Sequence, residues 1–333
     1  MTDAPVYTSF MTDEKPPRGA SLYKGPASAP RDKRQRERDR AGEPARESRA
    51  PAADRPPRRG PPREAAATQA NAPRTREIVH DDPATRPARE QRIYGLNACL
   101  ALFAKRPDAI RKVWLLENRI PKLKAVLAWC VQHRLGYTLV QADDLEKLSG
   151  SAHHEGVCFG ALPAEEGNLS DWLRDLPAGP AVALWLDGVG NPHNLGAILR
   201  SAAHFGAGAV LLPRESELAL SGAAARVAEG GAEAVPIVRL GRADNAFAQL
   251  SSAGFGIAAT VVRGGTPLHA AKLPQRVVWV LGAEQLGVDA ELAKRAAVRI
   301  QIPGTGAVDS LNVAAAAAVL LSEWWRQQGP RQG

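Results

Sequence analysis

The sequence predicts an α/β protein whose carboxyl-terminal half is a parallel sheet covered by helices on both faces. From residue 181 onward, short and continuously apolar runs alternate with helical stretches. That alternation is typical of a parallel sheet. Residues 93–162 show a shorter version of the same alternation, which predicts a small α/β domain before the large one. The first quarter of the chain is polar and proline-rich with few aromatic residues, which excludes a packed core there.

Residues 1–91 are expected to form a disordered arm rich in arginine and proline. Residues 1–92 hold 20 Lys and Arg against 14 Asp and Glu, and 14 of the 26 prolines. Such a segment buries too little apolar surface to offset its chain entropy. The runs Arg31–Arg40 and Arg55–Arg59 favour salt-sensitive contact with a phosphate backbone. A solvated tail with no partner is the alternative.

Residues 92–163 are expected to form the small α/β domain, with order beginning near Ile93. Apolar spacing predicts helices at Tyr94–Lys105, Leu123–His133 and Asp143–Leu148. Buried strands are predicted at Val113–Leu116, Tyr137–Val140 and Gly156–Ala161. Residues 164–179 contain acids, glycines and prolines and are expected to be a linker.

Residues 180–329 are expected to form the large domain. The predicted strands are Ala181–Leu186, Ala209–Leu212, Val235–Val238, Gly256–Val261, Val277–Leu281 and Arg299–Ile302. The predicted helices are Leu195–Phe205, Ala223–Ala228, Asn245–Ala253, Asp289–Ala297 and Leu311–Arg326. Ligands of such sheets bind beyond the carboxyl ends of the strands. The chemistry is therefore expected in the loops that follow strands.

A first unusual loop, residues 187–200, follows the first strand of the large domain. It reads Asp-Gly-Val-Gly-Asn-Pro-His-Asn-Leu-Gly-Ala-Ile-Leu-Arg. Asn194 is expected to cap the helix that follows. Arg200 lies in that helix beside an otherwise apolar stretch. An ordinary helix cap and a surface arginine would explain these two residues equally well.

Two further loops follow later strands. Residues 281–287 read Leu-Gly-Ala-Glu-Gln-Leu-Gly, in which Gly282 permits a ligand to approach the backbone and Glu284 can orient a cation. Residues 302–314 contain Ser310-Leu311-Asn312 and lead into an alanine-rich helix. The small residues of that helix predict close backbone packing, and the Ser310 and Asn312 side chains offer hydrogen bonds at its entrance.

Other site classes have little support in this sequence. Neither GxGxxG after the first strand of the large domain nor GxxxxGK[ST] is present, which argues against a dinucleotide fold or a phosphate-loop enzyme. Cys99, Cys130 and Cys158 lie far apart, so a metal site or disulfide framework is not expected. The sequence has neither a membrane-length apolar run nor a signal-peptide core, and we expect a cytoplasmic protein.

Together the three loops resemble the signature motifs of the SpoU (TrmH-type) branch of the SPOUT methyltransferase superfamily. The resemblance spans residues 181–325 and rests most on Asn191–Arg200 and Ser310–Val313. Residues 93–162 are similar to the substrate (RNA)-binding domain that precedes many of these enzymes. The overall layout resembles a bacterial group of uncharacterised tRNA/rRNA methyltransferases.

The resemblance implies a C-terminal SPOUT domain with a trefoil knot, a homodimer, and S-adenosylmethionine as cofactor. It places the cofactor against the backbone of Gly282, Ile302 and Leu311, with Thr260 as a weaker candidate. The implied reaction is methyl transfer to a ribose 2′-hydroxyl of tRNA or rRNA. No metal and no membrane are implied as partners.

The resemblance also implies catalytic roles for five residues. We expect Arg200 to hold the adjacent phosphate and stabilise developing alkoxide character, because a guanidinium is very hard to deprotonate. Asn194, Glu284, Ser310 and Asn312 are expected to orient Arg200 and the substrate.

Two positions depart from the family pattern. Ala314 stands where serine is common, and Gln285 stands where glycine is common. These departures leave open an alternative function, a weakly active or inactive RNA-binding or ribosome-assembly protein that keeps the fold. The motifs do not encode which RNA, or which of its nucleotides, is the target.

Overall fold

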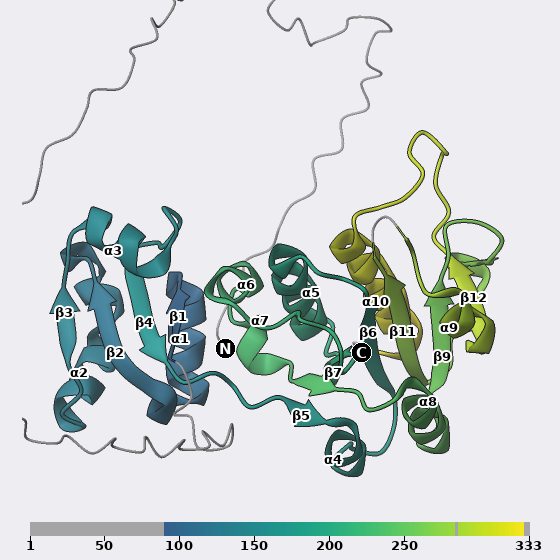
Figure 1. Ribbon diagram of the computed structural model, residues 1–333, viewed down its shortest axis with the longest axis horizontal. Helices are drawn as coiled ribbons and strands as arrows, with labels where there is room; N and C mark the ends of the chain where they lie inside the picture. Colours follow the sequence, from purple (N-terminus) through teal and green to yellow (C-terminus); the bar gives the residue numbers. More distant parts are fainter. Residues whose placement is uncertain (1–89, 284–285, 330–333) are drawn as a thin grey trace, which may run out of the picture. The chain divides into compact units, whose positions relative to one another are not determined.

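The computed structural model describes residues 90–283 and 286–329, which contain two sheets (Figure 1). The expectation of a disordered arm at residues 1–91 falls almost wholly outside these residues. The smaller sheet has the strand order β1-β4-β2-β3. Its strands are β1 (Gln91–Tyr94), β2 (Ile110–Leu115), β3 (Tyr137–Leu139) and β4 (Val157–Ala161). β4 pairs antiparallel with both β1 and β2, whereas β2 and β3 are parallel.

Helices cover both faces of the smaller sheet. On one face, α1 (Leu96–Lys105) and α2 (Lys124–Gln132) pack into a core with strand residues such as Ile93 and Phe159. On the other, Leu145 of α3 (Ala142–Ser149) packs against Tyr94 and Trp114. Two 3₁₀ turns, η3 (Pro107–Ala109) and η4 (Glu117–Lys122), flank β2.

The larger sheet has eight strands in the order β10-β12-β9-β11-β6-β7-β8-β5, and every pairing in it is parallel. This confirms the predicted parallel α/β architecture. The strands are β5 (Gly167–Asn168), β6 (Ala181–Asp187), β7 (Ala209–Leu212), β8 (Ile237–Arg239), β9 (Gly256–Thr260), β10 (Thr266–Pro267), β11 (Arg276–Gly282) and β12 (Val298–Gln301).

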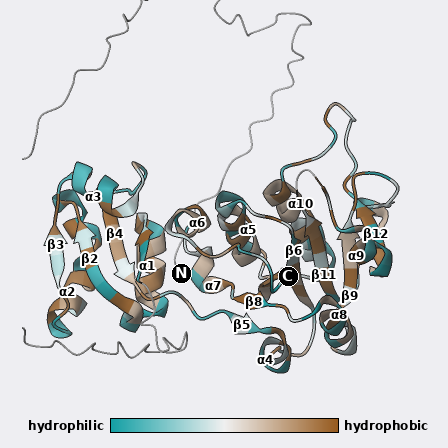
Figure 2. Cartoon of the chain, in the orientation of Figure 1, coloured by the Kyte–Doolittle hydropathy of each residue, from teal (hydrophilic) through white to brown (hydrophobic). Residues whose placement is uncertain are grey.

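Two hydrophobic cores cover the two faces of this sheet. Alternate residues of β6 point to opposite sides: Leu184 belongs to one core and Trp185 to the other. Figure 2 shows the central strands β6 and β11 in hydrophobic colours, as expected for strands buried on both faces. The helices of this region are α4 (Leu169–Arg174), α5 (Pro192–His204), α6 (Gly222–Ala228), α7 (Gly231–Ala234), α8 (Ala243–Ser252), α9 (Ala290–Arg295) and α10 (Val313–Gln328), with the turn η5 (Leu268–Ala270).

Helices α5 and α10 contribute to the first of these cores and pack against each other. Leu195 and Ile198 of α5 are buried with Ala317 and Leu320 of α10. Alanines 314–318 in α10 let the two helix backbones approach closely, as the small-residue pattern predicted. The contact places the first turns of both helices near the carboxyl edge of the sheet.

Several local predictions differ from the structure. The helix expected from Tyr94 begins at Leu96, because Gln91–Tyr94 pairs as an edge strand with β4 and buries Ile93 and Tyr94. Residues 164–179, expected as a linker, contain β5 and α4. They are ordered into these elements because Leu169 and neighbouring apolar side chains pack into the core that contains Trp185. The trefoil knot that the resemblance implies stays a prediction.

Candidate functional site

The order of the strands brings the three unusual loops to one edge of the larger sheet. β11 lies between β6 and β9, and Gly282 pairs in register with Asp187. The first and second loops therefore leave the sheet side by side. β12 lies on the other side of β9, so the third loop starts from the same carboxyl edge. The edge predicted for the chemistry is where these loops gather.

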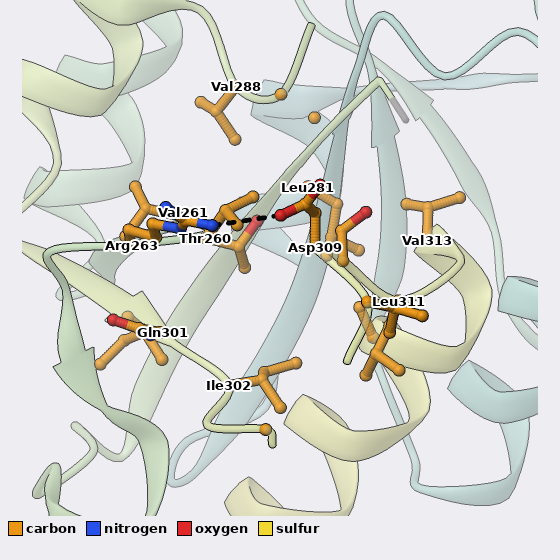
Figure 3. A pocket seen from close by; sticks show the side chains of 18 of the residues that line it. Thr260, Val261, Arg263, Leu281, Val288, Gln301, Ile302, Asp309, Leu311 and Val313 are labelled. Carbon is orange, nitrogen blue, oxygen red and sulfur yellow. Dashed lines mark hydrogen bonds and ion pairs between the residues drawn. The ribbon is translucent and has the colours of Figure 1, made fainter. Parts of the chain in front are cut away.

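A cavity of about 440 Å³ lies at this edge. All four predicted cofactor-binding residues, Thr260, Gly282, Ile302 and Leu311, line it, and so does Ser310. Figure 3 shows Thr260, Leu281, Ile302 and Leu311 among the side chains that surround the cavity. The volume falls within the range of small-molecule and cofactor sites.

Gly282 lies where two stretches of backbone nearly touch. A Cβ atom built on it would lie 1.9 Å from the carbonyl carbon of Gly287 and 2.1 Å from the amide nitrogen of Val288. No side chain fits at that distance, so only glycine lets the second loop fold back here. The same lack of a side chain exposes the main chain of the β11 end to the cavity.

Thr260, at the end of β9, uses its side chain for a hydrogen bond to a neighbouring strand of the sheet. Its hydroxyl donates a hydrogen bond of 3.0 Å to the carbonyl oxygen of Val280 in β11. The cavity walls near it are formed by apolar side chains such as Leu281, Ile302 and Val313. Apolar walls with backbone polar groups at strand ends suit a flat, uncharged ring system such as adenine. The residues present therefore fit the adenosine part of S-adenosylmethionine.

Two predicted catalytic residues meet directly beside the cavity. The Asn312 amide Nδ2 donates a hydrogen bond of 3.1 Å to Oδ1 of Asn194. The Oδ1 atom of Asn312 also accepts from the backbone N–H groups of Ala314 and Ala315 and so caps α10. Asn312 thus caps α10 and at the same time binds the side chain of Asn194 in α5.

The expectation that Asn194 caps α5 is wrong. The cap is Asn191, whose Oδ1 accepts from the backbone N–H of His193 at 2.9 Å. Pro192 occupies the first position of the helix, where its missing N–H costs nothing. The helix therefore starts early enough to place Asn194 in its first turn, where the side chain is available to Asn312.

Arg200 lies on α5, six residues beyond Asn194, and is exposed. Within residues 90–283 and 286–329 its guanidinium makes neither a hydrogen bond nor an ion pair, and it is not part of the cavity lining. Its five donors are therefore available to an outside partner.

Glu284 and Gln285 lie outside the described residues. Ser310 is exposed at the cavity.

Sequence reasoning did not select Asp187, although it begins the first loop. Its Oδ2 accepts a hydrogen bond of 2.8 Å from the backbone N–H of Asp289, the residue that caps α9. Burial raises the pKa of Asp187, and the negative charges of Asp289 and Glu215 raise it further. A polar side chain at the carboxyl end of a buried strand was the available signal.

Two charged residues of the cavity were also missed. Arg263 and Asp309 both line it, and the Arg263 Nη2 donates to Asp309 Oδ1 at 3.1 Å (Figure 3). Asp309 stands directly before Ser310 in the third loop, but Arg263 lies in a stretch without a distinguishing pattern. No periodicity connects residues 46 positions apart.

Metal chemistry has no visible basis in the part of the chain that the structure describes. No group of three or more His, Cys, Asp or Glu side chains there is arranged to hold a metal ion. All three cysteines are free and buried. None of the described helices is both long and apolar enough to cross a membrane.

Two family models match the chain. Residues 181–322 match the SpoU rRNA Methylase family. Residues 92–166 match the RNA 2′-O ribose methyltransferase substrate-binding domain. The two matches cover the regions of the larger and the smaller sheet.

Relatives named as methyltransferases are similar to this chain over about 240 residues. A protein of Escherichia coli O157:H7 named uncharacterized tRNA/rRNA methyltransferase YfiF is 40% identical over 240 residues, 72% of this chain and 69% of that protein. The 23S rRNA (guanosine-2′-O-)-methyltransferase RlmB of Nitrosomonas europaea is 31% identical over 245 residues, 73% of this chain and 94% of that protein.

Solved structures with the same fold include methyltransferases. A structure described as an RNA 2′-O ribose methyltransferase matches with a TM-score of 0.61 and 27% identity, covering 72% of this chain and 89% of that one. An AdoMet-bound rRNA methyltransferase from Sinorhizobium meliloti matches with a TM-score of 0.58 and 27% identity, covering 72% and 87%.

Proposed function

This chain belongs to the SpoU family of RNA 2′-O-ribose methyltransferases, and we propose that it methylates the ribose of a guanosine in 23S ribosomal RNA. It is an S-adenosylmethionine-dependent enzyme whose substrate is RNA. The guanosine target is supported by relatives named for that reaction, which align over nearly their whole length. The single observation that best supports an active site here is the cavity at the carboxyl edge of the sheet. Gly282, Ile302 and Leu311 line it, and the Asn194–Asn312 contact lies beside it.

The residues of the site divide into a binding set and a positioning set. When bound, S-adenosylmethionine supplies a methyl group already activated on a sulfonium. The backbone at Gly282, Ile302 and Leu311 binds the cofactor, with Thr260 lining the same cavity. Ser310 is exposed at that cavity and orients the ribose. Glu284 keeps the orienting role that the motif implies.

Arg200 is the residue to which we assign the main catalytic role. Its exposed guanidinium, which makes neither a hydrogen bond nor an ion pair with the described residues, can bind the phosphate next to the target ribose through two hydrogen bonds. The same positive charge stabilises the oxygen of the 2′-hydroxyl as its proton leaves. Asn194 and Asn312, locked to each other, fix the start of the helix that carries Arg200.

Kinetics of Arg200 variants test this role. With transcribed 23S RNA fragments, Arg200→Ala should lower kcat by roughly two orders of magnitude or more. Arg200→Lys keeps the charge and loses the planar fork, so it should remain clearly impaired. Affinity for S-adenosylhomocysteine, measured by calorimetry, should stay unchanged in both.

A matched control is Lys272→Ala, an exposed cation at the opposite, amino-terminal edge of β11. It should retain wild-type kcat. Near-normal turnover by Arg200→Lys would contradict the fork geometry. Near-normal turnover by Arg200→Ala would contradict the catalytic role altogether.

The target itself is tested by mapping ribose methylation across total RNA from a parent strain, a strain in which the gene is deleted, and the complemented deletion strain. One 23S guanosine should lose its methyl group and regain it on complementation. Loss confined to tRNA would overturn the ribosomal assignment. No change at any site, with cofactor binding intact, would favour the inactive RNA-binding alternative.

We also propose that the active form is a homodimer in the cytoplasm. Trp325, in the last turn of α10 and outside the cavity lining, is a large apolar side chain that is 37% exposed. A second copy would cover such a surface. Light scattering of the purified full chain should give twice the monomer mass of 35.4 kDa. A monomer with full activity would contradict the dimer.

A further inference from the structure

The cofactor cavity has a distinctive charge pattern. Of its described lining residues, two carry a charge: Arg263, which follows β9, and Asp309, which precedes α10. They come from two different loops of the lining, and the Arg263 Nη2 atom lies 3.1 Å from Asp309 Oδ1 (Figure 3). One cation and one anion thus lie side by side in a lining whose other described residues are uncharged.

This ion pair contributes little to the stability of the fold. The Arg263 side chain is 83% exposed and that of Asp309 is 87% exposed. Exposed pairs of this kind typically stabilise a protein by about 0–1 kcal/mol. Neither side chain makes a second hydrogen bond or ion pair within the described part of the chain. Breaking the Arg263–Asp309 pair so that each residue binds a ligand group therefore costs little free energy.

The cofactor has a matching pair of charges. Its adenosine part is uncharged and suits the apolar walls around Ile302 and Leu311. Its amino-acid end carries an α-carboxylate and an α-ammonium on the same carbon. A zwitterion needs a cation and an anion at close spacing, which is the arrangement of Arg263 and Asp309.

We propose that the Arg263–Asp309 pair opens to hold the amino-acid end of S-adenosylmethionine. Arg263 binds the α-carboxylate through its planar guanidinium, and Asp309 binds the α-ammonium. In the free protein the two residues satisfy each other. The proposal rests on the proposed function, because it needs the cofactor in this cavity.

An RNA phosphate is a poorer occupant for this pair. Arg263 alone would attract it, but the Asp309 carboxylate, in direct contact with that arginine, repels a second anion. A zwitterion satisfies both residues and a phosphate satisfies one. Binding of RNA by Arg263 is therefore kept as an outcome of the test.

Calorimetric titration with two ligands isolates the amino-acid end. S-adenosylhomocysteine carries the zwitterion, whereas 5′-methylthioadenosine has the same nucleoside and lacks it. Arg263→Gln and Asp309→Asn should each weaken S-adenosylhomocysteine about tenfold, the size expected for a lost charged hydrogen bond. Both variants should bind 5′-methylthioadenosine within about twofold of wild type.

Arg299→Gln serves as the matched control, because Arg299 is exposed on neighbouring β12 and does not line the cavity. It should bind both ligands as wild type does. Circular dichroism should show all three variants folded, as expected for exposed side chains. The double variant should lose less than the sum of the two single losses, because the two residues contact each other and hold the same amino-acid end of the ligand.

Three results would overturn the proposal. Equal weakening of both ligands would mean that the pair only shapes the cavity. Unchanged affinity for both, with weaker RNA binding by Arg263→Gln in a filter assay, would assign Arg263 to the RNA backbone. If the wild-type chain bound neither ligand, the cofactor site itself, and with it the proposed function, would fail.

Discussion

The cofactor cavity and the contact between α5 and α10 lie at the same edge of the larger sheet, yet they are built by different means. The cavity is shaped mainly by main chain, where strand ends approach closely at Gly282, and by walls in which apolar side chains predominate. The helix contact is shaped by side chains, with Asn312 holding both its own helix and Asn194.

The difference indicates how each part can fail. A site built from backbone tolerates many side-chain changes and fails when an atom is added where two chains touch. A site built from side chains fails when one amide or guanidinium is removed. Substitutions in each part distinguish the two ways of failing, and the largest effect is expected at Gly282.

Gly282→Ala should break the backbone-built cavity. The added Cβ would fall 1.9 Å from the carbonyl carbon of Gly287, and backbone atoms cannot give way as a flexible side chain can. The loop must move, and calorimetry should show loss of S-adenosylhomocysteine affinity by about a hundredfold or more, roughly 3 kcal/mol.

Gly304→Ala is the matched control for that change. Gly304 lines the same cavity, but a Cβ there meets no atom within 4 Å. Its affinity should stay close to wild type. Equal losses in the two variants would show that any added methyl group harms the cavity and would contradict the role of backbone contact.

Asn312→Ala should break the side-chain-built contact. It removes the cap of α10, which costs about 0.5–2 kcal/mol of stability, and the hydrogen bond to Asn194. We expect a melting temperature lower by several degrees and a kcat lower by about tenfold, with nearly normal cofactor affinity.

A double-mutant cycle with Asn194→Ala separates the two losses. The cap is lost only with Asn312, whereas the amide–amide contact is lost with either residue. A coupling free energy of about 0.5 kcal/mol or more in the kinetic barrier would support the contact. Fully additive effects would show that the two asparagines act independently.

Glu323→Gln tests whether Glu323, near the carboxyl end of α10, stabilises the fold without contributing to catalysis. Glu323 is 6% exposed and accepts hydrogen bonds from Arg326 at 2.9 and 2.6 Å and from Gln327 at 2.8 Å. The hydrogen bonds from Arg326 lower the pKa of Glu323 to about 2, against an ordinary value of 4.5. Its carboxylate therefore stabilises the fold above pH 4.5, and this contribution is lost as pH falls from 4.5 toward 2.

At pH 7 the variant should melt several degrees below wild type, and the gap should close as the pH is lowered through 4. Methyl transfer by the folded variant should be normal, because Glu323 is remote from the cavity lining. Glu291→Gln, which breaks an exposed pair with Lys294, should shift the melting temperature far less. A gap that persists unchanged at low pH would contradict the role of the charge.

Asp187→Asn should have the smallest effect and the opposite sign. Burial raises the pKa of Asp187, so the folded protein is stabilised by its protonation. That stabilisation is fully present below the ordinary pKa of 3.8 and is lost as pH rises through the raised value. Asparagine stays uncharged and can still accept the hydrogen bond from Asp289.

Thermal melts across pH 3 to 8 check this sign. The variant should equal or slightly exceed wild type at neutral pH, by about 1–3 °C, and the difference should vanish at the acid end. A large loss of stability at neutral pH would show that the carboxylate is needed as an ion. In that case its charge would support the end of β11 beside Gly282.

Local sequence patterns were enough to predict a parallel α/β domain and the three loops that meet at the carboxyl edge of its sheet. Continuous apolar runs such as Val277–Leu281 identify strands buried on both faces, because only a covered parallel sheet hides both sides. The resemblance carried by the loop motifs implied Gly282, Ile302, Leu311 and Thr260 as cofactor residues, and all four line one cavity. These signals are local, since each depends on residues within a few positions of one another.

The tertiary structure alone decided which distant residues meet. Asn191 rather than Asn194 caps α5, which leaves Asn194 for Asn312 across 118 positions of the chain. Edge strands such as Gln91–Tyr94 form only because β4 offers a partner. Arg263 and Asp309 are exposed and carry no periodic pattern, so nothing near either residue predicts the pair. The strand order of a sheet is set by long-range packing, and that order placed both charges at one cavity mouth.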